Sequence, residues 1–188
     1  MKFFALIFAI LLVASCASGP AIDTRYTLSA PPAKSLSSSQ VARKVIIAPV
    51  LLPSELKRSS IVVKRSNGEM AIDDDLRWAG SLDDQIARLL ALHLENNLGN
   101  TLVVTEQSTA ASDADFSITV DINRFEPVEF ERVELDASWT VVTLGDQRKV
   151  ASGRSSHQLQ ADGSVSDAIK KMSDAVGKLA EDLAIEIR

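Results

Sequence analysis

The stretch "DFSITVDINRF", residues 115–125, decides the fold class of this chain. Strict alternation of apolar and polar side chains predicts a half-buried β-strand, because successive side chains of a strand point to opposite faces. The pattern slips at Arg124–Phe125, which predicts a bulge or the strand end there. The inward side chains are expected to be Phe116, Ile118, Val120 and Ile122.

Two further runs extend this strand into a sheet. "RVELDASWTVVTL" (132–144) alternates again and places Trp139 inward, in phase with Leu135 and Val141. A turn at Gly145–Asp146 leads into "KVASGRSSHQLQ" (149–160). The small and polar side chains of that run predict an edge strand. Consecutive strands joined by short turns are expected to pair antiparallel.

Two amphipathic helices flank these strands in the sequence. Leucine and isoleucine recur at helical spacing over residues 82–98, with Ser81 as the expected N-cap and Gly99 as the stop. Apolar residues recur at spacings of four and three over residues 165–187. The element order predicts an α+β fold, a mostly antiparallel sheet with two main amphipathic helices packed on one face.

The region before the first helix predicts a buried strand and a hairpin. "KVIIAPVLLP" (44–53) is an apolar run, in which Pro49 limits ladder hydrogen bonding. Asn67-Gly68 separates two strand-like runs and predicts a type I′ turn. Trp78 is expected in the core at the helix entry, with an interface anchor as the alternative.

The N-terminus carries the only cysteine of the chain. Lys2 precedes the apolar run Phe3–Val13, and Val13–Cys16 is similar to a bacterial lipobox. Residues 1–15 are therefore expected to be a signal peptide and Cys16 to be lipidated. The alternatives are an ordinary cleaved signal with a stray cysteine, or a short uncleaved anchor. By resemblance to other Gram-negative lipoproteins, Ala17 in place of Asp implies transfer to the outer membrane.

The remaining chain divides into a tether and one domain. Residues 16–42 are rich in small and polar residues and in proline, which predicts a lipidated flexible tether, with "YTL" (26–28) as a short edge strand. Residues 43–188 are expected to form a single α+β domain. The chain has 46% hydrophobic and 24% charged residues, as expected for a globular protein.

Charge and motif content disfavour several functions. The net charge is -5, or -6 without Lys2, and no basic cluster predicts nucleic-acid binding. The two histidines, His93 and His157, lack metal-ligand spacing, and there is no phosphate loop or nucleophile elbow. The sequence therefore predicts a binding or scaffold protein with no catalytic residue, no cofactor and no metal, and an enzyme is the weaker alternative.

The order of these landmarks resembles the family of ABC-type transport auxiliary lipoproteins. The chain departs from relatives in "SELKRSS" (54–60), where they often carry an aromatic residue. The matching segments are the lipobox ending at Cys16, "YTL", "VLLPSELKRSSIVVKR" (50–65), "LRWAGSLDDQIARLLALHLENNL" (76–98), "DFSITVDINRFEP" (115–127), "VELDASWTV" (133–141) and the last helix.

The resemblance implies an outer-membrane lipoprotein on the periplasmic face of a Gram-negative bacterium. Such proteins work with inner-membrane MCE-domain proteins that carry lipids across the envelope, and a matching homo-oligomer is plausible beside a ring-forming partner. The rival function is a lipoprotein regulator of a periplasmic cell-wall enzyme, which a similar fold also permits. The partner-binding candidates are Asn67, Gly68, Arg77, Trp78 and His157, which offer exposed backbone or an aromatic beside polar groups.

Overall fold

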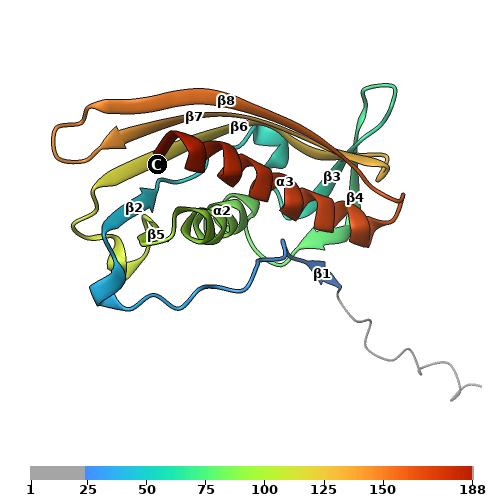
Figure 1. The fold of residues 1–188 in the computed structure, drawn as a ribbon. Helices are drawn as coiled ribbons and strands as arrows, with labels where there is room; N and C mark the ends of the chain where they lie inside the picture. Colours follow the sequence, from blue (N-terminus) through green and yellow to red (C-terminus); the bar gives the residue numbers. More distant parts are fainter. Residues whose placement is uncertain (1–23, 188) are drawn as a thin grey trace, which may run out of the picture.

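The computed structural model describes residues 24–187 of the chain (Figure 1). The predicted signal peptide and Cys16 lie outside these residues. Within them, no helix is long and apolar enough to cross a membrane.

Three long strands form the antiparallel part of the sheet. They are β6 (Phe116–Val128), β7 (Arg132–Thr143) and β8 (Lys149–Gln160), and each pairs antiparallel with the next. The ladder of β6 and β7 shifts between Ile122 and Arg124, which confirms the predicted bulge. In the sheet, β8 pairs with β7 alone and is an edge strand, as its polar side chains predicted.

Five shorter strands continue the sheet beyond β6. They are β1 (Arg25–Tyr26), β2 (Arg43–Ile47), β3 (Ser60–Lys64), β4 (Met70–Trp78) and β5 (Thr101–Thr105). β2 lies parallel to both β5 and β6, while β3 and β4 form an antiparallel hairpin whose outer edge carries β1. The sheet is thus mixed, because local hairpins pair antiparallel whereas the distant short strands join through crossovers.

Both main helices cover the same face of the sheet, as predicted. α2 (Leu82–Leu98) and α3 (Val165–Ile187) lie on one side of β6–β8 in Figure 1. Ser81 occupies the N-cap position of α2, but its side chain makes no cap hydrogen bond. Gly99 ends α2 with φ +73°, a conformation that favours glycine. Short 3₁₀ helices, η1 (Ser38–Gln40), η2 (Ser54–Leu56) and η3 (Thr109–Ala111), lie in the connections.

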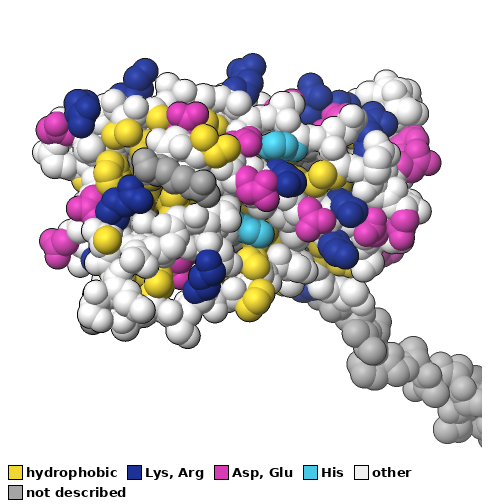
Figure 2. Space-filling model, in the orientation of Figure 1, with side chains coloured by type: hydrophobic (Ala, Val, Ile, Leu, Met, Phe, Trp, Pro, Cys, Tyr) yellow, Lys and Arg dark blue, Asp and Glu magenta, His cyan; other side chains and the backbone are white. Residues whose placement is uncertain are grey.

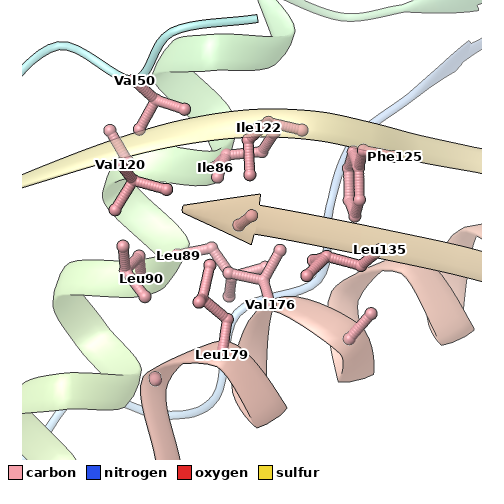
Figure 3. Close-up of a cluster of buried hydrophobic side chains, with 14 of the residues drawn as sticks. Val50, Ile86, Leu89, Leu90, Val120, Ile122, Phe125, Leu135, Val176 and Leu179 are labelled. Carbon is pink, nitrogen blue, oxygen red and sulfur yellow. The ribbon is translucent and has the colours of Figure 1, made fainter. Parts of the chain in front are cut away.

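The core fills the layer between the helices and the sheet. Figure 3 shows side chains from α2, α3, β6 and β7 converging there, among them Phe125, Leu90 and Leu179, which are fully buried. Trp139 is buried as predicted, and its indole Nε1–H donates to the Ser155 hydroxyl over 3.2 Å. The two helices approach closely where a Cβ on Gly177 would lie 3.0 Å from the His93 ring.

The hairpin turn differs in type from the prediction. The backbone N–H of Arg65 donates to Glu69 and that of Gly68 donates to Arg65, and only Gly68 in this turn has a positive φ. Asn67 is therefore not left-handed, and a type I turn followed by a left-handed glycine replaces the expected type I′ turn. The Asn67 side chain accepts a hydrogen bond from the Glu69 backbone N–H instead.

The boundary of the tether is also corrected. β1 pairs with the end of β4, Leu28 is buried, and the Leu28 N–H donates to the side chain of Gln85 on α2. Farther along, the Lys34 ammonium group donates to the backbone carbonyl of Asn96 on the same helix. The side-chain amide of Asn96 donates in turn to the Pro32 carbonyl. Residues 25–34 therefore belong to the folded domain, because strand pairing and side-chain hydrogen bonds hold them against it.

Candidate functional site: two clefts beside strand β4

Four of the five sequence candidates lie on the β3–β4 hairpin, two in its turn and two at the far end of β4. Asn67 and Gly68 form its exposed turn, and Arg77 and Trp78 lie at the end of β4. His157 lies at a different edge of the sheet, on β8, where its Nε2 is 2.9 Å from a carboxylate oxygen of Asp182 on α3. This contact gives His157 a structural role, since it ties the edge strand to the helix.

Trp78 lies in the core, as the primary expectation had it. Trp78 is only 3% exposed, so its indole does not protrude as an interface anchor. Arg77 is half-buried, and its Nε–H donates to the backbone carbonyl of Asp74 over 2.7 Å. These two residues therefore shape a surface and do not project from it.

A bulge interrupts the β3–β4 ladder and exposes acidic residues. The pairing moves from Ile61–Asp73 directly to Ser60–Arg77, so residues 74–76 have no partner across the ladder. The Ser60 hydroxyl donates to Asp74, and the Asp75 N–H donates to Asp73. The bulge bends the strand and leaves Asp73, Asp74 and Asp75 exposed.

The first cleft lies at the start of β4 and has a volume of about 570 Å³. We call it the hairpin-end cleft. Ile72 and Met70 on β4 are 48% and 39% exposed, and outside its contact with β1 this stretch of β4 has no partner on its outer edge. It is lined by Val63, Arg65, Ala71, Ile72, Asp73, Asp74, Glu129, Phe130 and Glu131.

A left-handed turn forms one wall of the hairpin-end cleft. Glu129 and Phe130, between β6 and β7, have φ values of +51° and +59°. The Glu131 N–H donates to the Val128 carbonyl, so Glu129 and Phe130 are the central residues of a β-turn, and both have the positive φ of a type I′ turn. This turn could not be predicted from the sequence, because neither residue is the glycine or asparagine that usually signals it.

The hairpin-end cleft is negatively charged at neutral pH. Four carboxylates and one guanidinium line it. The backbone N–H and the hydroxyl of Ser66 both donate to Glu129, and these hydrogen bonds hold the pKa of Glu129 below its ordinary value. An apolar floor with an acidic rim fits a partner surface that is apolar and basic.

The second cleft lies at the other end of β4 and has a volume of about 430 Å³. We call it the anchor-side cleft, since the described chain begins beside it. Its floor is formed by the buried side chains of Leu52, Leu56, Trp78 and Leu82. Its rim carries Arg25, Lys57 and Arg58, together with one acid, Asp83.

A network of charges covers the face of the sheet opposite the helices. Arg124 contacts Glu134 at 3.1 Å and Asp136 at 3.3 Å, and Arg132 also contacts Glu134 at 3.1 Å. Burial would raise the pKa of Glu134, but hydrogen bonds from these two arginines outweigh it and lower the pKa. Nearby, burial raises the pKa of Glu126. The self-paired network resembles a solvated sheet face and not a catalytic centre.

Across the described residues, no group of three or more His, Cys, Asp or Glu side chains is placed to hold a metal ion. On the face shown in Figure 2, basic and acidic side chains are interspersed. The described part of the chain thus defines an α+β domain with one cleft near each end of strand β4.

The chain belongs to the family described as the ABC-type transport auxiliary lipoprotein component, whose model matches residues 26–184. None of the curated proteins matches it significantly. Among solved structures, it is similar to an uncharacterized protein (TM-score 0.72, 18% identity, covering 87% of this chain and 97% of the other).

Two further structures share the fold. A Xanthomonas campestris protein of family DUF330 gives a TM-score of 0.67 at 17% identity, over 85% of this chain and 92% of that one. The PelC dodecamer of Paraburkholderia phytofirmans gives 0.51 at 10% identity, over 84% and 93%. At these identities the likeness concerns the fold.

Proposed function

We propose that this chain is an outer-membrane-anchored periplasmic lipoprotein that docks an MCE-type, ABC-linked lipid transport assembly and has no enzymatic activity. The observation that carries the proposal is the family match over nearly the whole described domain, residues 26–184. An auxiliary component of a transporter acts by contact. The clefts beside β4 supply a surface suited to contact, whereas no metal-type cluster is present among the described residues.

The hairpin-end cleft is the proposed docking surface for the MCE-domain partner. It combines the exposed apolar side chain of Ile72 with the free edge of β4, on which Met70 is also exposed. A free strand edge accepts main-chain hydrogen bonds from a partner, and exposed apolar groups beside it supply buried area. The acidic rim adds orientation, because complementary charge steers association more than it adds affinity.

Self-association is part of the proposal. PelC, which shares this fold, forms a dodecamer. A partner that forms rings is matched most simply by a lipoprotein ring, since repeated identical contacts then meet repeated identical sites. The outer edge of β8 is free to take part in such contacts within the described sheet.

Photo-crosslinking in cells tests the docking surface. A photoreactive amino acid at position 68 or 72 is expected to capture an MCE-domain protein, because Ile72 is exposed in the hairpin-end cleft and Gly68 is exposed in the turn of the same hairpin. Position 158, exposed on β8, is the matched control and is expected to capture less of that partner. If positions 68 and 72 capture only a cell-wall synthase, the transport function is contradicted and the chain is a regulator of a cell-wall enzyme.

A further inference from the structure

The folded domain begins at Arg25, the first residue of β1. Arg25 and Tyr26 pair with Arg77 and Trp78, and the Ala79 N–H donates to the Tyr26 carbonyl over 2.7 Å. Three residues after Tyr26, the Ser29 N–H donates to the Ser173 hydroxyl of α3 over 2.9 Å. The chain is therefore fixed to the domain from Arg25 onward, so only the segment before it can separate the domain from an anchor at Cys16.

The segment between Cys16 and Arg25 is short. Nine residue steps separate Cys16 from Arg25. A fully extended chain spans about 3.4 Å per residue, so these steps reach roughly 30 Å at most. An anchor at Cys16 therefore holds the anchor-side cleft near the membrane, whereas the proposed tether of residues 16–42 would have allowed about three times that reach.

The anchor-side cleft has an apolar floor and a mostly basic rim. Leu56 and Trp78 are buried in its floor, and Arg25, Lys57 and Arg58 surround it. Lys57 and Arg58 are exposed and follow η2 directly. Within the described residues, neither of these two side chains forms an ion pair. Their charges are thus not neutralised inside the fold, unlike those of Arg124 and Arg132 on the sheet face.

We propose that the anchor-side cleft faces the membrane that carries the anchor, and that Arg25, Lys57 and Arg58 bind the phosphate groups of its anionic phospholipids. Basic residues close to an anionic bilayer are attracted within about a Debye length, roughly 10 Å. The chain as a whole is acidic, so orientations that present this cationic rim are favoured over those that present acidic surface. The contact would turn a tethered domain into an oriented one.

The inference rests on the proposed anchor, so the experiment supplies that anchor chemically. Cys16 is the only cysteine, so a maleimide phospholipid couples there specifically in the mature chain. A diazirine amino acid replaces Ser59, which lines the anchor-side cleft and is exposed, or the exposed Gln158 on β8 as control. The anchored chains are placed in vesicles of phosphatidylcholine alone, or with a third of phosphatidylglycerol, and lipid adducts are measured by mass spectrometry after irradiation.

The expected result is phosphatidylglycerol adducts at position 59 and few at position 158. Lys57→Ala with Arg58→Ala should reduce the adducts at 59 about fivefold for each charge removed. Lys149→Ala with Arg154→Ala, an exposed pair on β8, removes the same charge and should leave them unchanged. Unchanged circular dichroism would show that both double variants remain folded.

Four outcomes would overturn the inference. Equal adduct yields in the two vesicle types, or in the Lys57/Arg58 variant, would show mere proximity to the bilayer. Equal yields at 59 and 158 would show an unoriented domain. Loss of adducts with sodium phosphate, but not with sodium chloride at equal ionic strength, would show a site for free anions. Crosslinks from position 59 to a second copy of the chain in place of lipid would assign the cleft to self-association. None of these results bears on lipidation in cells or on docking at the hairpin-end cleft.

Discussion

Trp139 shows how one side chain fixes the register of β7 and β8. A Cβ added to Gly153 would lie 2.6 Å from the Trp139 ring, closer than atoms can approach. Gly153→Ala should therefore force the indole aside and cost about 1–3 kcal/mol, and Trp139→Ala should cost about 3–5 kcal/mol through lost packing. Denaturant unfolding measures both. An unchanged midpoint for either variant would show that the indole does not lie between the strands.

Glu126 makes the stability of the fold depend on pH. Its residue is 4% exposed, and burial raises its pKa above 4.5 in the folded state. The folded state therefore binds more protons than the unfolded state between 4.5 and the raised pKa, so this residue lowers stability as pH rises through that window. Glu126→Gln retains an acceptor for the Phe125 N–H.

The Glu126→Gln variant is expected to unfold at a higher temperature than the wild type near pH 7, and to differ little near pH 4. Thermal unfolding followed by circular dichroism at both values measures this difference. A variant that is less stable at neutral pH would show that the ionised carboxylate is stabilised by Lys64 and Arg124.

At the scale of elements, alternation predicted the long strands and periodicity predicted both helices. These signals are local, because each residue only reports whether its own face is buried. The parallel pairings of β2 could not be predicted in the same way, since they join residues 43–47 to residues 101–105 and 116–118. Likewise, the exposed Ile72 reads as a core residue until the free edge of β4 is known.

The candidate site was likewise predictable only where its signal is local in the sequence. The hairpin was predicted at Asn67-Gly68, and that prediction identified one side of the hairpin-end cleft. The opposite wall, Glu129–Phe130, has no turn signal in the sequence, and the loop contacts that join the two are nonlocal: the Glu129 N–H donates to the Lys64 carbonyl. The lining of either cleft comes from segments far apart in the chain, so it required the fold.

The left-handed turn of Glu129 and Phe130 gives an element-scale prediction. A left-handed conformation costs a residue with a Cβ about 1–2 kcal/mol, so Phe130→Gly should relieve backbone strain while losing a half-buried ring that packs on the core. Stability should therefore change little, whereas binding of the partner should weaken because Phe130 lines the hairpin-end cleft. Measured stability and affinity that fall together would assign Phe130 a purely structural role.

At the scale of the whole molecule, the account depends on an anchor at Cys16. Cys16→Ser removes the only thiol and should abolish incorporation of labelled palmitate, leaving an unprocessed precursor or a soluble periplasmic form. Radiolabelling of the wild type and the variant in the same strain measures this. Equal incorporation would contradict lipidation at Cys16, since the lipid must then be attached elsewhere.

Docking through the hairpin-end cleft is the central claim, and affinity for a purified MCE-domain protein tests it most directly. Ile72→Asp places a charge on the exposed apolar floor of the cleft, and Ile185→Asp makes the same change at a residue of α3 that is 67% exposed. The account predicts that Ile72→Asp weakens binding about tenfold or more, as at interface hot spots, and that Ile185→Asp binds like the wild type. Equal affinities for all three proteins, or no binding by the folded wild type, would contradict it.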